Sequence, residues 1–282
     1  MRDLAELQDD IERLYQVQGE DVAQRVEELA SELRARLQRG EVRAAEPHDG
    51  GWRVNRWVKQ GLLLAFRHGR PRSFPGAASA SEFFDKSTVP PRRLTMDDAV
   101  RLVPGGSSIR EGAYVARGVV CMPPMFVNVG AFVDEGTMID SHALVGSCAQ
   151  IGKRVHLSAG AQVGGVLEPP GAMPVVIEDD VFVGANSAVL EGTLVRRGAV
   201  LAPGTTLSRG TRLYDVPNER VLRATDTAPL TVPTRAVVVP GSRVLSGDFA
   251  AQHAIHLYAP IIVKYRDGST DDSVALEEAL RA

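Results

Sequence analysis

The sequence predicts a mainly β protein: a left-handed parallel β-helix of hexapeptide repeats, with an α-helical domain before it and a small extension after it. Two observations support this fold class. Aromatic residues make up only 5% of the 282 residues while Gly reaches 27, a composition that suits a thin core built in small layers. In addition, an aliphatic residue or Cys recurs at every sixth position through the middle of the chain, which is the period of a hexapeptide β-helix.

The six-residue period holds from Ile109 to Val163 and again from Ile177 to Leu213. Each hexad supplies one short strand, whose aliphatic residue points into a triangular prism, and one corner, where residues such as Gly tolerate the tight turn. Backbone hydrogen bonds then run from coil to coil along the prism axis. The periodic positions are Ile109, Val115, Cys121, Val127, Val133, Ile139, Val145, Ile151, Leu157, Val163, Ile177, Val183, Val189, Val195, Leu201, Leu207 and Leu213.

The register breaks between Val163 and Ile177, a spacing that exceeds a pair of hexads by two residues. The segment 164–176 is rich in Gly and Pro and is predicted to leave the prism as a loop insertion. Insertions in repeat proteins map to loops on one face, which is often the binding face. We therefore expect this loop to help form a site, with a harmless surface excursion as the alternative.

The residues before the repeat, 1–108, are expected to form a helical domain and a connector. Apolar residues at helical spacing within 1–45 predict two helices, and Trp52 to Phe66 is a third candidate. Residues 67–108 contain Pro71, Pro75, Pro90, Pro91 and Pro104 and are expected to be irregular.

The repeat region itself is assigned to residues 109–214, and the extension to residues 215–282. Within the extension, 237–239 and 261–263 are predicted to be short strands, and 273–281 a terminal helix.

Composition and charge exclude several classes of protein. The chain has 32 basic and 35 acidic residues and a net charge of −3, which argues against general binding to nucleic acid or to a membrane through basic patches. No apolar run approaches the length of a membrane span, and the first residues lack the apolar core of a signal peptide. Two cysteines exclude a disulfide scaffold, so we expect a cytoplasmic protein.

Polar residues that point outward from the prism are the candidates for chemistry. Asp134, Glu135, Asp140 and Glu191 carry carboxylates, and a carboxylate in a partly enclosed cleft can orient an amine and take its proton. Solvated surface carboxylates are the alternative. Flat-sided prisms commonly pack side by side as trimers, so we expect any site to be shared by two chains.

Basic residues and glycines add further candidates. Arg67, Arg101 and Arg110 flank the start of the repeat, and arginine suits bidentate recognition of carboxylates. Lys264 follows an apolar segment and can meet a phosphate, whereas Gly165 allows a ligand to approach the backbone. The alternative for each of these residues is an ordinary place on the surface without a role in binding.

Metal binding and cysteine chemistry are not expected. His142 and His156 fall at different hexad positions without a third His at coil spacing, which argues against the zinc site of a hydratase. Cys121 occupies an inward position, and Cys148 is expected to be packed rather than nucleophilic.

Residues 114–214 resemble the tetrahydrodipicolinate N-succinyltransferase family. The resemblance rests on specific strings rather than on the period, above all Gly136-Thr137-Met138-Ile139-Asp140. The other matching segments are 127–135, 145–153, 155–158, 164–169, 177–179 and 189–192, and more loosely 57–60, 63–67 and 84–86.

This resemblance implies a homotrimer with active sites between neighbouring β-helices. It implies transfer of a succinyl group from succinyl-CoA to tetrahydrodipicolinate, giving N-succinyl-2-amino-6-oxopimelate in lysine and diaminopimelate biosynthesis. Succinyl-CoA would be a co-substrate, and no bound cofactor, metal, nucleic acid or membrane is expected.

Together, the resemblance (for Asp140, Glu191, Arg101 and the loop) and the residue types (for the others) predict a role for each candidate. Asp140 and Glu191 are expected to be catalytic. Arg101, Asp140 and Arg67 are expected to bind the substrate. Gly165, Ser147 and Lys264 are expected to bind acyl-CoA, and the loop at 164–174 to help enclose it.

Three departures from the family pattern keep other functions open. Ser141-His142 stands where the family has Thr-Trp, next to the expected substrate, and the segments 225–232 and 264–270 also differ. The alternatives are an acyltransferase that uses an acetyl donor or a secondary-metabolite amine, and a β-helix binding module that lacks catalysis.

Overall fold

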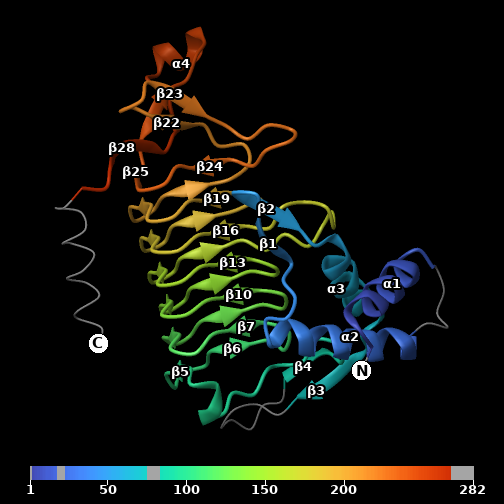
Figure 1. The fold of residues 1–282 in the computed structure, drawn as a ribbon. Helices are drawn as coiled ribbons and strands as arrows, with labels where there is room; N and C mark the ends of the chain where they lie inside the picture. Colours follow the sequence, from blue (N-terminus) through green and yellow to red (C-terminus); the bar gives the residue numbers. More distant parts are fainter. Residues whose placement is uncertain (1, 18–22, 75–82, 268–282) are drawn as a thin grey trace.

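The computed structural model describes residues 2–17, 23–74 and 83–267. Most of these residues form a tall stack of short parallel strands, with a group of helices against one side (Figure 1). The helix expected at 273–281 lies outside the described residues. No helix in the described ranges combines the length and the apolar character that a membrane crossing needs.

Three parallel ladders form the walls of a triangular prism, and each is named here by its first strand. The β5 ladder contains β5 (Arg101–Leu102), β8 (Val120–Cys121), β11 (Met138–Ile139), β14 (His156–Leu157), β17 (Phe182–Val183), β20 (Val200–Leu201) and β25 (Ala236–Val239). The β6 ladder contains β6 (Ser108–Ile109), β9 (Phe126–Val127), β12 (Leu144–Val145), β15 (Gln162–Val163), β18 (Ala188–Val189) and β21 (Thr206–Leu207). The β7 ladder contains β7 (Tyr114–Val115), β10 (Phe132–Val133), β13 (Gln150–Ile151), β16 (Val176–Ile177), β19 (Leu194–Val195) and β24 (Thr231–Val232).

The interior of the prism follows the six-residue period. Residues at the second position of each strand pair with their equivalents one coil away, as Val133 does with Ile151 and Ile151 with Ile177. Each of these three side chains is fully buried. The left-handed parallel β-helix predicted from the repeat is therefore confirmed.

The break in the period occupies a single corner of the prism. Strand β16 pairs with β13, so it is the strand that directly follows β15 in the coil. The segment 164–175 thus replaces one ordinary corner, and it contains no strand, although its length exceeds that of a hexad. The ladder then continues above the loop without a change of register.

Parallel pairing extends beyond the periodic segment at both ends. Strand β5 pairs with β8 before residue 109, and β24 and β25 join the ladders after residue 214. Between β21 and β24 the chain leaves the prism through β22 (Leu213–Asp215) and β23 (Arg220–Leu222). The repeat pattern misses these strands because their connections are not hexads.

The rest of the extension caps the upper end of the prism (Figure 1). Strand β28 (Ile261–Tyr265) runs antiparallel to β25, and β26 (Ser242–Val244) pairs with β27 (His256–Tyr258) around the short helix α4 (Asp248–Gln252). The short strands predicted at 237–239 and 261–263 are thus present.

The N-terminal region contains α1 (Leu4–Tyr15), α2 (Ala23–Gln38) and α3 (Arg56–His68). The third helix begins at Arg56 rather than at Trp52, because Trp52 belongs to a hairpin of β1 (Ala45–His48) and β2 (Gly51–Val54). The indole Nε1 of Trp52 donates a hydrogen bond to Glu178 of the prism at 3.2 Å. Residues 51–54 therefore pair as a strand and contact the prism instead of extending α3.

Helices α2 and α3 pack closely at Gly61, where a larger residue would require the Leu33 side chain to shift. A Cβ atom on Gly61 of α3 would lie 2.5 Å from the Leu33 Cδ2 atom of α2. The resulting core is separate from that of the prism, but it includes the prism residues Val129 and Cys148. The helices are therefore fixed against the prism by apolar packing.

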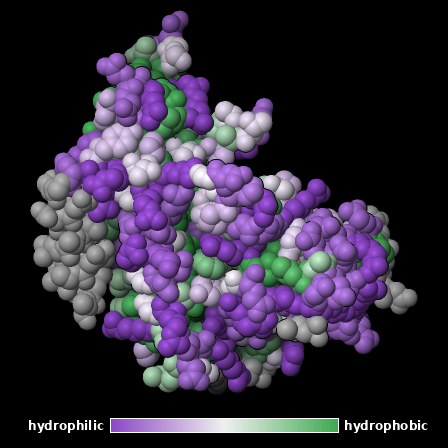
Figure 2. Space-filling model, in the orientation of Figure 1, coloured by the Kyte–Doolittle hydropathy of each residue, from purple (hydrophilic) through white to green (hydrophobic). Residues whose placement is uncertain are grey.

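The connector is more regular than the sequence suggested. It contains a hairpin of β3 (Pro71–Phe74) and β4 (Phe83–Lys86) and a 3₁₀ turn at Met96–Asp98. Pro71 opens its strand, where the missing N–H is tolerated, so it does not prevent pairing. The surface seen in Figure 2 is mostly hydrophilic, with hydrophobic residues reaching it only in small areas.

The inward stack predicts a strong effect of a single truncation. Ile139→Ala removes a fully buried side chain from a prism that cannot collapse around the gap, and we expect a loss of about 2–5 kcal/mol in the free energy of unfolding. Chemical denaturation measures it. The control Val244→Ala changes a residue that is 66% exposed and should alter stability by less than about 0.5 kcal/mol. Equal effects of both changes would contradict the proposed role of the stack.

Candidate functional site

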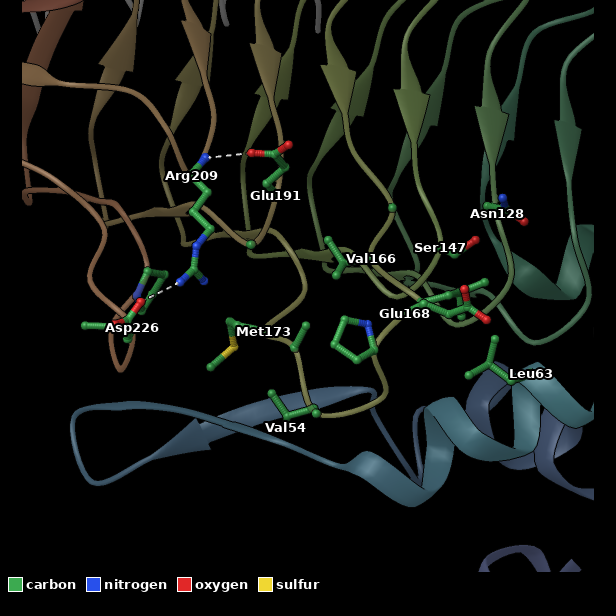
Figure 3. Close-up of a pocket in the computed structure, with 18 of the residues that line it drawn as sticks. Val54, Leu63, Asn128, Ser147, Val166, Glu168, Met173, Glu191, Arg209 and Asp226 are labelled. Carbon is green, nitrogen blue, oxygen red and sulfur yellow. Dashed lines mark hydrogen bonds and ion pairs between the residues drawn. The ribbon is translucent and has the colours of Figure 1, made fainter. Parts of the chain in front are cut away.

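A cavity of about 1060 Å³ runs along one edge of the prism (Figure 3). This edge, called the cavity edge here, consists of the corners that follow the strands of the β6 ladder: residues 110–113, 128–131, 146–149, 164–175, 190–193 and 208–211. Helix α3 and strand β2 face it from the side, and residues 225–229 close its upper end. The cavity therefore combines side chains that are distant in the sequence.

The cavity gathers three of the predicted site residues. Ser147, Gly165 and Glu191 all line it. Asp140, Arg101, Arg67 and Lys264 are not among its lining residues.

Glu191 stands at the upper end of the cavity. Its backbone has φ +52°, a left-handed conformation that turns the chain sharply at this corner, and its side chain is exposed. The carboxylate accepts a hydrogen bond from the backbone N–H of Arg209 at 3.0 Å. Arg209 lies one coil above Glu191 at the equivalent corner position, so the prism itself orients this carboxylate.

Arg209 connects the same corner to the segment that closes the cavity. Its guanidinium donates to the Thr225 carbonyl at 3.3 Å and lies 3.5 Å from the Asp226 carboxylate. Figure 3 shows this side chain reaching from beside Glu191 toward Asp226. Sequence reasoning missed Arg209, although it lies eighteen residues after Glu191, the spacing of one full coil.

Asp140 lies on a different edge of the prism. It follows a strand of the β5 ladder, and its carboxylate accepts a hydrogen bond from the Ser141 N–H at 2.7 Å. The β6 ladder separates this edge from the cavity edge, and Glu191 lies two coils higher. Within one chain, therefore, Asp140 and Glu191 do not come together.

The remaining predicted residues are also spread over the molecule. Arg101 opens β5, the lowest strand of the ladder that carries Asp140, and is exposed. Arg67 lies in the last turn of α3, with its guanidinium 5.5 Å from the centre of the Tyr15 ring. Lys264 lies on β28 and pairs with Asp267 at 3.2 Å.

The lower end of the cavity contains Arg110, which the sequence had marked only as a flanking arginine. Its guanidinium pairs with Asp85 at 2.5 Å and donates to the Asn128 side chain at 3.3 Å. The ring of Phe66 from α3 lies 5.6 Å away. These contacts hold the guanidinium in one place.

The loop 164–175 is held in two ways. At Gly165, a Cβ atom would lie 2.6 Å from the Ser147 backbone N, so the close approach of loop and prism requires Gly. From the other side, Lys59 of α3 donates to the carbonyls of Ala172 at 2.7 Å and Pro169 at 3.3 Å. Lys59 is fully buried, and desolvation lowers its pKa.

The cysteines are packed in the interior. Burial raises the pKa of both Cys121 and Cys148 to about 12, so their thiols stay protonated near neutral pH and are poor nucleophiles. The described part of the chain contains no group of three or more His, Cys, Asp or Glu residues placed to hold a metal. His142 is exposed at the corner of Asp140, whereas His156 stacks on Phe182 with ring centres 5.0 Å apart.

Comparison with known proteins gives consistent matches. A family model described as Tetrahydrodipicolinate N-succinyltransferase N-terminal matches residues 6–68, and one described as Hexapeptide repeat of succinyl-transferase matches residues 174–209. A 2,3,4,5-tetrahydropyridine-2,6-dicarboxylate N-succinyltransferase of Afipia carboxidovorans is 43% identical, over 90% of this chain and 88% of its own length. Proteins with the same name from Idiomarina loihiensis and Bradyrhizobium diazoefficiens are 41% and 42% identical, over 87% and 91% of this chain and 86% and 90% of theirs.

The contacts of Lys59 predict a local effect on the loop. Lys59→Met keeps the length of the side chain but removes its charged hydrogen bonds, each of which contributes about 1.5–3 kcal/mol. We expect the backbone amides of Val166 and Ala172 to exchange hydrogen at least about 10-fold faster, as measured by mass spectrometry. Global stability should change less, because the variant also removes the cost of burying a charge.

Lys86→Met is the matched control for that experiment. Lys86 also donates to a backbone carbonyl, that of Gly69, but far from the loop. Its replacement should leave exchange in 164–175 unchanged. Unchanged exchange in Lys59→Met would show that the lysine does not hold the loop.

Proposed function

The chain belongs to the tetrahydrodipicolinate N-succinyltransferase family, and from this premise we propose that it transfers the succinyl group of succinyl-CoA to the amino group of ring-opened tetrahydrodipicolinate. The identity of 43% over 90% of the chain is the observation that carries this proposal. The protein is an acyltransferase, and the reaction belongs to lysine and diaminopimelate biosynthesis. A cytoplasmic location follows from that assignment.

The reaction requires no covalent intermediate on the enzyme. The acceptor nitrogen attacks the thioester carbonyl, a C–N bond forms, the C–S bond breaks, and coenzyme A leaves as its thiol after taking up a proton. The protein must therefore hold both reactants in line, accept the proton of the amine and stabilise the oxyanion. The high pKa of Cys148 is consistent with a mechanism that uses no thiol nucleophile.

We assign the acid and base roles to Asp140 and Glu191. Each has its carboxylate oriented by a backbone N–H, from Ser141 and Arg209 respectively, and each keeps a free oxygen for an amine. Ser147 and Gly165 lie on the cavity wall between Glu191 and Arg110, which suits the acyl-CoA chain. Arg101 for the substrate remains a prediction from the resemblance, whereas Arg67 for the substrate and Lys264 for acyl-CoA remain predictions from residue type and position.

We further propose that the site is completed between subunits of a homotrimer. One prism carries two half-sites: Asp140 and Arg101 belong to the β5 ladder and its following corners, whereas Ser147, Gly165 and Glu191 belong to the cavity edge. Packing the first edge of one chain against the cavity edge of its neighbour brings both carboxylates to one cleft, and cyclic symmetry repeats this at every interface.

A thiol-release assay tests the activity. Purified protein with succinyl-CoA should release coenzyme A only when tetrahydrodipicolinate or its open-chain mimic L-2-aminopimelate is present. Acetyl-CoA in parallel tests the alternative donor, which is pertinent because His142 stands beside Asp140. Acceptor-dependent release with acetyl-CoA alone would reject the succinyl assignment, and no release with either donor would reject the proposed reaction.

Mixed trimers test whether the site is shared. We expect Asp140→Asn and Glu191→Gln each to lower kcat by at least about 100-fold, in line with the loss of a general base, without loss of assembly. If the two carboxylates come from different chains, unfolding and refolding an equal mixture of the variants should restore about a quarter of wild-type activity, because one interface in four receives both intact residues. A mixture as inactive as its components would contradict a site shared between chains.

A further inference from the structure

Two cationic side chains line the described part of the cavity, and they differ in how they are held. Arg110 is 19% exposed, pairs with Asp85 at 2.5 Å and lies near the rings of Phe66 and Phe126. Arg209 is 58% exposed. Of these two lining side chains, only that of Arg209 is more than half exposed.

The contacts of Arg209 are also weak enough to be exchanged. The Asp226 carboxylate lies 3.5 Å away and is fully open to solvent, and the Thr225 carbonyl lies at 3.3 Å. Ion pairs at such exposed positions contribute little to stability, because solvent screens them. A ligand carboxylate that binds both nitrogens of the guanidinium side by side forms a stronger contact.

The position of Arg209 relates it directly to the proposed chemistry. Its backbone N–H holds the Glu191 carboxylate, while its side chain extends along the cavity toward residues 225–229. The guanidinium is therefore separated from Glu191, the proposed base, by about the length of the Arg209 side chain. A four-carbon diacyl group or a dicarboxylate acceptor can span such a distance between its reacting end and its free carboxylate.

We propose that Arg209 is the residue that binds a free carboxylate of a substrate in this cavity, and that Asp226 occupies the guanidinium until the substrate arrives. The inference rests on the proposed function and adds a specificity-determining residue to it. Two sources supply this chemistry: the terminal carboxylate of the succinyl donor, and a carboxylate of the acceptor. Residues 225–229 then act as the wall that keeps the guanidinium turned into the cavity.

Steady-state kinetics with two donors separate the sources. Butyryl-CoA has a methyl group where succinyl-CoA has its carboxylate, so it cannot use Arg209. In Arg209→Gln we expect KM to rise about 10-fold or more for the carboxylate-bearing substrate, with a smaller change in kcat, as the loss of a charged hydrogen bond implies. A donor role raises KM for succinyl-CoA but not butyryl-CoA. An acceptor role raises the KM of L-2-aminopimelate with both donors.

Three further variants keep the test specific. Arg209→Lys should lose less affinity than Arg209→Gln, because it keeps a positive charge. Asp226→Asn should lower the same KM below the wild-type value, because it removes the carboxylate that competes for Arg209. Arg212→Gln is the matched control, since Arg212 is an exposed arginine near Arg209 that does not line the cavity. The proposal fails if Arg209→Gln leaves every KM within twofold, if Arg212→Gln has the same effect, or if Asp226→Asn also raises KM.

Binding measurements separate this proposal from the proposed function. Calorimetry on the complete protein, with succinyl-CoA, butyryl-CoA and L-2-aminopimelate added singly, needs no turnover. An inactive wild-type protein would reject the reaction, while selective loss of succinyl-CoA or L-2-aminopimelate binding in Arg209→Gln would still support the carboxylate contact. Equal binding of all three ligands by wild type and variant would overturn it.

Discussion

The stack of one inward aliphatic side chain per hexad, joined from coil to coil by backbone hydrogen bonds, is the constraint on which the rest of the structure depends. Because Val133, Ile151 and Ile177 must lie above one another, no strand in the stack can shift by a single residue without turning its side chain to the other face. Extra residues can leave the prism only at a corner. The loop 164–175 does so at the corner between the β6 and β7 ladders, which makes this edge the place for a cavity.

The same regularity explains why Asp140 and Glu191, the two carboxylates of the proposed site, lie on different edges of one prism. Residues on one edge occupy equivalent corner positions in successive coils, as Glu191 and Arg209 do. Residues at other positions of the coil lie on other edges. Asp140 is one hexad out of phase with the cavity edge, so no local adjustment brings it to Glu191. The proposed homotrimer would unite such residues, and the prism offers flat, repeated surfaces for it.

The period predicted the fold, the buried positions and the place of the loop, because each depends on local spacing alone. It did not predict the hairpin that contains Trp52, since this hairpin depends on pairing between β1 and β2 and contacts Glu178, far along the chain. The pattern also led to Glu191 but not to its neighbours Thr225 and Asp226. Their place in the cavity depends on an irregular return of the chain between β23 and β24, which leaves no periodic signal.

The number of coils also fixes the length of the cavity edge. Its ends, at Arg110 and Arg209, are separated by the five steps from β6 to β21, and adjacent strands lie about 4.8 Å apart, so they are about 24 Å apart along the axis. A prism changes length only by whole coils. The reach of this edge can therefore evolve only in increments of about 4.8 Å, and finer adjustment to a ligand falls to the segments that leave the prism, 164–175 and 225–229.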